Sequence, residues 1–443
     1  MTAQDAAREH WLARHAAWAP RRAGEPAWLA ALRREALDAF AAGGLPHPRL
    51  EEWRYTNVAP IARVAFEPAA GDAAVSREAL ESASFPVYAC SFAAFVDGRH
   101  RPELSAPRAL AGEVRVQGMA ELLARDPERL AGRLGALVDA KLHPFAALAT
   151  AFLDDGAALL LPRGVELAQP VHVVFAASGA RADRAQHPRV LVAAEPGSRA
   201  QLIVDHVGLA PARGLTNAVI EVDVGRGASL DLVIVQREPD ESLHVSNLAA
   251  RLDRDARLAV HTLTLGGALV RNDASFLLAG EGAACRIHGL FAGSGHQLLD
   301  HHSLVDHALP RCESRQLTKG ILGGSARGVF RGRVIVRPGA QRSDAEQLNP
   351  NLLLSAGAEV DSKPQLEIHA DDVKCRHGSS IGRLDEDALF YLRARGIDLR
   401  EARELLTRGF AAELLDALPV AALGNALAGL LGERLSGAAP GAA

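Results

Sequence analysis

The spacing of hydrophobic residues divides the chain into three parts. Within residues 1–42, apolar side chains recur every three or four positions, as on one face of a helix, and Gly43-Gly44 ends this pattern. Between about residues 152 and 368, short runs of Val, Leu and Ile alternate with turn-forming Gly and Asp, which is typical of strands. Helical spacing returns after Ile381. The pattern therefore predicts helices at both ends and β structure between them.

The β-rich part contains an imperfect repeat. Four alanines that follow turn residues lie 28 residues apart: Ala200, Ala228, Ala256 and Ala284. Leu202, Leu230 and Leu258 then fall in one column of the repeat. The fourth copy breaks the columns with Arg286 and His288. A strand-and-turn unit of this length without intervening helices indicates a β-solenoid, because each coil buries its inward side chains by stacking on the next. An irregular β-sandwich is the alternative.

These patterns predict a division of the chain into an N-terminal helical and mixed α/β region at 1–145, a solenoid core at 146–380, a C-terminal helical domain at 381–436 and a disordered tail at 437–443. In the C-terminal domain, Asp385 is placed to cap a helix that ends near Arg395. A second helix is predicted to carry one face made of Ala402, Leu405, Leu406, Gly409, Phe410 and Glu413. The apolar window 417–432 is shorter than the roughly 20 residues that span a bilayer, so we expect a packed helix and loop there.

Composition excludes several classes of protein. The formal net charge is −4 and both signs are spread along the 443 residues, so no basic field exists to attract nucleic acid or a membrane. The lysines, at 141, 319, 363 and 374, never follow a glycine, which excludes the phosphate-binding loop of ATPases. The four cysteines are too irregularly spaced for a disulfide framework, and the N-terminus has no apolar secretion signal. These features predict a cytoplasmic protein.

The sharpest candidate for chemistry is the run Asp371–Gly378, which reads DDVKCRHG. On an extended strand, Cys375 and His377 point to the same face about 7 Å apart, because each residue advances about 3.4 Å. Thiolate and imidazole suit an iron-sulfur cluster or zinc, and we expect Lys374 and Arg376 to favour the thiolate. Clusters and structural zinc usually take four protein ligands, so further ligands must come from elsewhere. Other cysteines of this chain could supply them, and an equally direct solution is a partner subunit, which would make this a half-site. A buried structural cysteine beside a capping histidine is the alternative.

A second candidate for metal binding is a run of histidines close to Cys312, namely His296, His301, His302 and His307. His301 and His302 fall on opposite faces of any strand, so no single face collects all four. The favoured interpretation is polar surface or turn residues. We interpret Cys285 and Cys312 as thiols of the core.

Adjacent carboxylates suggest a different class of function. Asp371 and Asp372, like Asp154 and Asp155, form pairs of the kind that sugar-cleaving β-helices use for acid-base work or calcium binding. A carbohydrate-active β-helix enzyme that uses Asp371 and Asp372 is therefore an alternative function. Neighbouring side chains diverge on a strand, which favours solvated turns instead.

Residues 343–397 are similar, over their full length, to the C-terminal signature of the SufB/SufD family of iron-sulfur cluster assembly proteins. Three shorter segments match the family in the same order, at 44–58, 95–105 and 145–175, so the resemblance covers about 44–415. Gly378 after His377 resembles the SufD form, since the SufB form carries an acidic residue there; SufB itself is the disfavoured alternative. His369 stands where the family leads us to expect an aromatic residue, either as a local substitution or as a third nearby ligand.

The resemblance implies a right-handed parallel β-helix flanked by helical domains. It implies a non-catalytic scaffold of the SufBCD complex, which pairs with SufB through the β-helix and with the ATPase SufC through the C-terminal helices. Cys375 and His377 match the family's cluster-assembly positions, expected near the SufB interface, where iron, sulfur or a nascent cluster is handled. ATP would bind SufC, a cysteine desulfurase would act indirectly, and the family allows a reduced flavin on the complex.

The resemblance also places the SufC contact within residues 385–415. An apolar surface there, with an arginine rim, would consist of Phe390, Tyr391, Leu405, Leu406, Phe410, Arg393 and Arg395. The same side chains could instead pack the helical domain itself.

Overall fold

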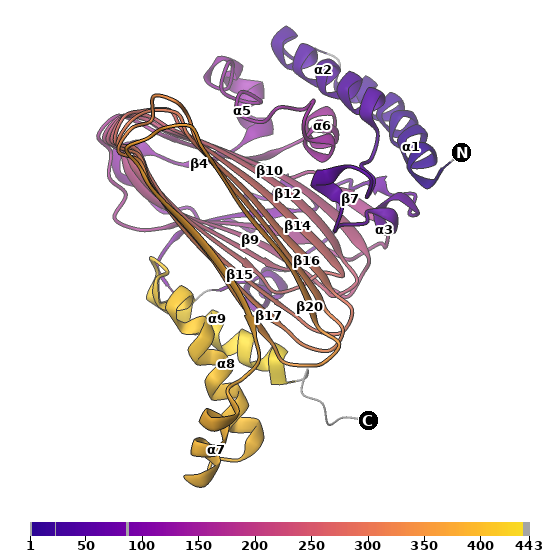
Figure 1. Cartoon of the computed structure of the whole chain (residues 1–443). Coiled ribbons are helices and arrows are strands. Elements are labelled where there is room, and N and C mark those ends of the chain that lie inside the picture. Colours follow the sequence, from indigo (N-terminus) through magenta and orange to yellow (C-terminus); the bar gives the residue numbers. More distant parts are fainter. Residues whose placement is uncertain (1, 23, 86–87, 437–443) are drawn as a thin grey trace.

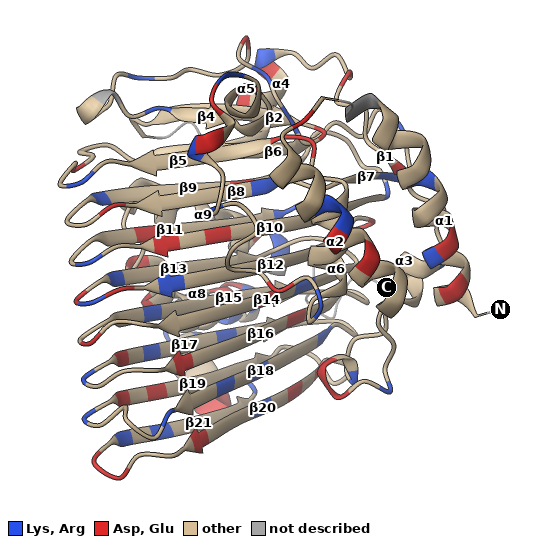
Figure 2. Cartoon of the chain, turned by 90° about the horizontal axis from the view of Figure 1, so that it is seen from above, with Lys and Arg blue, Asp and Glu red and all other residues tan. Residues whose placement is uncertain are grey.

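The computed structural model describes residues 2–22, 24–85 and 88–436, and its centre is a parallel β-solenoid. From β8 to β21, successive strands of the chain alternate between two sheets, so each pair of strands forms one coil (Figure 1). Figure 2 shows the coils stacked in order, with β20 and β21 at one end of the stack. The predicted fold class is confirmed and the β-sandwich alternative is wrong. The predicted disordered tail lies outside the described residues.

The first sheet contains β1 (Glu67–Pro68), β4 (Val116–Gly118), β5 (Gly156–Leu161), β7 (Arg184–Gln186), β8 (Arg189–Ala194), β10 (Gly214–Val224), β12 (Leu243–Leu252), β14 (Leu269–Leu278), β16 (Leu298–His307), β18 (Arg327–Val336) and β20 (Glu359–Ile368). The second sheet contains β2 (Ser91–Val96), β3 (Arg99–His100), β6 (Val171–Ala177), β9 (Arg199–Gly208), β11 (Ser229–Arg237), β13 (Arg257–Thr264), β15 (Ala284–Gly293), β17 (Glu313–Leu322), β19 (Asp344–Leu353) and β21 (Lys374–Gly382).

Strand pairing corrects the register that the repeat predicts. Leu230 pairs with Ala200 on the neighbouring strand, whereas the repeat places Leu230 beside Leu202. The reason is that the coil from Ala200 to Leu230 is two residues longer than the coil from Leu230 to Leu258. The fourth copy continues the inward columns with Cys285 and Ile287, since its coil is one residue shorter. Arg286 therefore takes an outward position. The predicted break in the columns is wrong.

One inward column of the solenoid changes from aliphatic to polar along the stack, although late coils still bury aliphatic side chains such as Val334 and Val336. This column runs through Leu202, Leu232, Val260, Ile287, Gln316, Gln347 and His377. In its polar part the Gln347 Nε2 donates a hydrogen bond to the Gln316 Oε1 at 2.9 Å, and Gln316 also bonds Ser303. These bonds satisfy the Gln316 amide and the Gln347 Nε2, which would otherwise be costly to bury, whereas the Gln347 Oε1 has no partner among the described residues.

Helices cover the outer face of both sheets. The N-terminal region supplies α1 (Ala3–Trp18), α2 (Ala27–Gly43), α3 (Ala59–Ala62), α4 (Arg77–Ala83), α5 (Met119–Arg125) and α6 (Pro144–Ala151), with short 3₁₀ helices η1 (Ala19–Arg22), η2 (Glu51–Trp53), η3 (Ala111–Glu113) and η4 (Pro127–Arg129). Apolar side chains of α1, α2 and α6, including Trp11, Phe40 and Phe145, pack near Leu215 of β10 and Leu243 of β12.

The C-terminal helices are α7 (Glu386–Ala394), α8 (Leu399–Asp416) and α9 (Ala421–Ser436). Leu414 of α8 and Leu427 of α9 pack on Val233 and Leu263 of the second sheet. Figure 1 shows α7 projecting away from the solenoid. No helix in the described part of the chain is long and apolar enough to cross a membrane. The window 417–432 forms a packed helix, as predicted, because Leu427 is buried.

Candidate site at the open end of the solenoid

The solenoid has an open end at its last coil. Among the described strands, β20 neighbours β18 alone and β21 neighbours β19 alone, so each leaves one edge unpaired. Large apolar side chains are exposed on this part of the molecule: Leu348 is 39 % exposed, Ile368 is 43 % and Ile381 is 51 %. Unpaired backbone beside apolar side chains is the arrangement to which another strand can add.

Cys375 and His377 lie on β21 at this open end. Their register partners on β19 are Ala345 and Gln347, which are both buried in the interior. Because residues at even spacing share one face of a strand, both side chains stand above the solenoid interior. Cys375 is half-buried and packs against the interior cluster, whereas His377 is exposed. The open end thus presents a thiol and an imidazole where a further coil would stack.

The basic neighbours of Cys375 do not activate it. Arg376 lies on the opposite face of β21, where its Nε donates to the Glu346 Oε1 at 2.8 Å, and Lys374 is exposed on the same outer face. Burial raises the pKa of the Cys375 thiol. The expectation that Lys374 and Arg376 favour the thiolate is therefore wrong, because strand alternation directs them away from the sulfur.

The prediction that the histidine run consists of surface or turn residues is wrong for two of its members. His301 and His307 point into the solenoid, where their ring nitrogens bond Thr264 and Ser314. Burial lowers the pKa of each to about 4. His302 lies on the outer face, which confirms that no single face collects all four. Within the ranges that the structure describes, no group of three or more His, Cys, Asp and Glu could hold a metal ion.

The remaining cysteines and carboxylates are structural in this arrangement. Cys285 and Cys312 are buried in the interior cluster, as predicted. Asp371 and Asp372 are exposed turn residues, and the Asp372 backbone N–H donates to the Gln341 Oε1 at 2.8 Å. Asp155 differs from the predicted solvated turn, because it is buried and accepts backbone hydrogen bonds from distant segments. His369 is exposed after the end of β20.

The residues predicted to contact SufC fall into an exposed group and a partly buried group. Phe390 is 74 % exposed and Tyr391 is 58 % exposed on α7, where the Arg395 guanidinium lies 4.9 Å from the Tyr391 ring. Leu405 of α8 is 43 % exposed, and Arg393 is exposed. Leu406 and Phe410 are partly buried, and Phe410 packs against the solenoid with Lys319 4.9 Å from its ring.

The predicted face of the second helix is right only in part, since Ala402 is buried and Leu406 and Phe410 are partly buried. The buried residues of α8 are Ala402, Thr407, Ala411, Leu414 and Leu415. Leu405, Gly409 and Glu413 are exposed instead. As predicted, Asp385 caps α7, since its carboxylate accepts backbone hydrogen bonds from Asp387 and Ala388.

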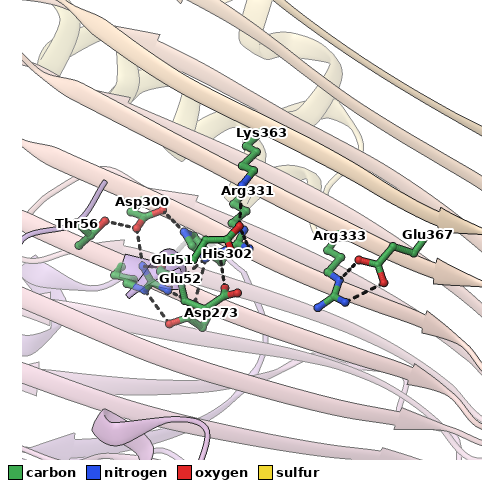
Figure 3. A network of polar contacts seen from close by, with 11 residues as sticks. Glu51, Glu52, Thr56, Asp273, Asp300, His302, Arg331, Arg333, Lys363 and Glu367 are labelled. Atoms are coloured by element: carbon green, nitrogen blue, oxygen red, sulfur yellow. Dashed lines mark hydrogen bonds and ion pairs between the residues drawn. The ribbon is translucent and has the colours of Figure 1, made fainter. Parts of the chain in front are cut away.

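A network of charged residues on the outer face of the first sheet was missed by the sequence reasoning (Figure 3). Arg271 bonds Asp273 at 2.8 Å and Asp300 at 3.0 Å, and its guanidinium lies 3.7 Å from the Trp53 ring. Thr56 donates to Asp300. Burial alone would raise the pKa of Asp300, but His302 and Arg271 hold this pKa at about 2. The sequence signal that could have revealed this network is the alternation of charged residues on β14, where Arg271 and Asp273 stand two positions apart in an otherwise uncharged strand.

The fold and the open end define a class of protein: a β-solenoid scaffold that presents one unfinished coil. Two family models cover most of the chain, SufBD protein N-terminal region over residues 21–173 and SUF system FeS cluster assembly, SufBD core domain, over 175–410. The chain belongs to the SufBD family of iron-sulfur cluster assembly proteins.

Three relatives resemble the chain over most of its length. It is 33 % identical to the iron-sulfur cluster assembly protein SufD of Escherichia coli over 400 residues, which cover 89 % of this chain and 90 % of that protein. A SufBD family protein of Synechocystis is 32 % identical, with 88 % of each chain covered. SufD of Bacillus subtilis is 28 % identical, with 89 % of this chain and 91 % of that protein covered.

Proposed function

We propose that this chain is the scaffold subunit of a cytoplasmic SufBCD complex and turns over no substrate alone. Its open end would pair with SufB by strand addition, and its C-terminal helices would bind the ATPase SufC. The observation that carries this proposal is the open edge of β21, which presents Cys375 and His377 together. No observation favours the carbohydrate-active alternative, since Asp371 and Asp372 serve a turn.

In this proposal the half-site handles cargo. Cys375 and His377 offer one sulfur and one nitrogen ligand to iron or a nascent cluster, and SufB supplies the rest. The pKa of Cys375, raised by burial, keeps a protonated thiol until a metal or a basic partner group removes the proton. ATP would bind SufC, a reduced flavin would bind the assembled complex, and a cysteine desulfurase would deliver sulfur indirectly.

Replacing either ligand tests the half-site. We expect Cys375→Ser or His377→Ala to lower cluster formation by more than about tenfold in the purified complex with SufB and SufC, because a metal ligand is lost. Iron and sulfide per complex would be measured, with assembly followed by size-exclusion chromatography. Ser379→Ala, two residues further on the same face, is the matched control. Full cluster formation in both ligand variants would contradict the proposed role.

A second test addresses the ATPase contact. Phe390→Ala is expected to weaken SufC binding by about tenfold or more, since an exposed aromatic anchor is typical of interface hot spots. Its own fold should be unaffected, because Phe390 is 74 % exposed. Leu142→Ala is the matched control, since Leu142 is 72 % exposed in the N-terminal region. Calorimetry with purified SufC gives the affinities; equal affinities for Phe390→Ala and the parent chain would refute this contact.

A further inference from the structure

A cavity of about 340 Å³ lies on the outer face of the first sheet. Its floor is formed by β12, β14, β16 and β18, and its walls are η2 and the segment 137–145. The volume falls within the range of small-molecule sites. The cavity is far in sequence from Cys375 and His377 and shares no lining residue with them.

One wall of the cavity is apolar. Trp53 and Phe145 face each other with ring centroids 5.6 Å apart, and Leu142 and Leu304 complete this side. Leu142 is 72 % exposed, although it is a large aliphatic residue beside a hollow. Trp53 and Phe145 are themselves buried, so Leu142 and Leu304 form the accessible part of this wall, which can cover an apolar group and remove its surface from water.

The opposite wall carries arginines. Arg331 and Arg333 share the outer face of β18, and both line the cavity. The Arg331 side chain is 9 % exposed, and its Nη1 lies 2.5 Å from the Glu52 Oε2, although Glu52 is 60 % exposed. Arg333 pairs with Glu367, which is 39 % exposed (Figure 3). An exposed carboxylate that pairs with a buried guanidinium is readily exchanged for another anion, because the exposed partner gains little from its position.

An unpartnered amide also lines the cavity. Asn247 is 4 % exposed, and its Nδ2 has no hydrogen-bond partner among the described residues. A buried donor without a partner is costly, and a ligand acceptor in the cavity would satisfy it. The lining thus combines a ring-binding wall, two arginines and a free donor.

We propose that this cavity binds a small organic anion with a flat apolar ring, whose phosphate or carboxylate displaces Glu52 from Arg331. Glu52 is then an internal stand-in for the anion of the ligand. The Glu52 backbone oxygen still accepts from Arg271 at 2.9 Å, so the wall stays in place when the side chain swings out. Leu142 and Leu304 contact the ring above the buried Trp53 and Phe145, and Asn247 donates to an acceptor on the ligand.

Calorimetry on the full chain with 1-naphthyl phosphate and 1-naphthoate tests this site and distinguishes the two anions. We expect one of them to bind at least about tenfold more tightly than inorganic phosphate or 1-naphthol, because ring and anion are held together. Ser275→Leu, which fills the floor, should abolish binding. Glu52→Gln should tighten binding severalfold, since the internal competitor is gone.

The control for charge alone is Glu346→Gln, which frees Arg376 from a surface pair outside the cavity and should leave the affinity unchanged. Thermal melting checks that each variant is folded. Binding that survives Ser275→Leu, or that Glu52→Gln leaves unchanged or weakens, would overturn the proposal. So would equal affinities for naphthyl phosphate and its two fragments.

Discussion

Acidification from pH 7 to pH 5 is expected to destabilise the isolated chain strongly. Burial lowers the pKa of several histidines, among them His187, His206 and His261 to about 3 and His301 and His307 to about 4. The unfolded chain takes up these protons near pH 6.5, whereas the folded chain stays neutral until its own lower pKa values. The unfolded state therefore binds more protons in this window, and stability falls as the pH falls through it.

Each of these histidines costs roughly 2 kcal/mol at pH 5, so together they approach the whole stability of a typical domain. Urea midpoints at pH 7, 6 and 5 measure the effect. His307→Asn should reduce this pH dependence, because it removes one of the buried histidines. A urea midpoint that stays constant from pH 7 to pH 5 would show that the buried histidines are not kept neutral by the fold.

The second large effect concerns Arg271. Arg271→Met is expected to destabilise the chain by about 3–5 kcal/mol, because it leaves buried Asp300 and part-buried Asp273 without their cation. Arg333→Met is the matched control on the same sheet face. Arg333 and Glu367 are 41 % and 39 % exposed, so their pair should contribute less than about 1 kcal/mol.

Urea unfolding of the two variants separates these outcomes. Adding Asp300→Asn to Arg271→Met should recover part of the loss, since one stranded charge is then removed. If Arg271→Met and Arg333→Met shift the urea midpoint equally, the buried network does not stabilise the contact between η2 and the sheet.

The sequence predicts the fold class because strand periodicity and turn residues are local signals. The cap at Asp385 is equally local, and it forms as predicted. The register is not local: each coil differs by one or two residues, so a fixed repeat places Leu230 beside Leu202 when the sheet places it beside Ala200. The predicted buried face of α8 was partly wrong for a related reason. The outer surface of the solenoid, and not the spacing within the helix alone, decides which side of α8 is buried.

The candidate site shows the same division. The shared face of Cys375 and His377 follows from strand alternation alone. That rule also directs Lys374 and Arg376 outward, and applying it to all four residues would have avoided the wrong expectation about the thiolate. The hydrogen bond between Thr56 and Asp300 joins residues 244 positions apart, and no pattern in a single sequence reveals such a contact.

The change from aliphatic to polar side chains along the inward column from Leu202 to His377 makes the first and last coils differ in how much they gain from stacking. The coils in which this column holds leucine and valine come first in the chain and bury the more apolar side chains. We therefore expect stacking to stabilise them most, so that later coils can add to them one at a time. The later coils, in which this column holds Gln316, Gln347 and His377, gain less from stacking. The stack ends where the sequence turns into helices, and under the proposed pairing a second solenoid at the open edges of β20 and β21 would continue it across a chain boundary.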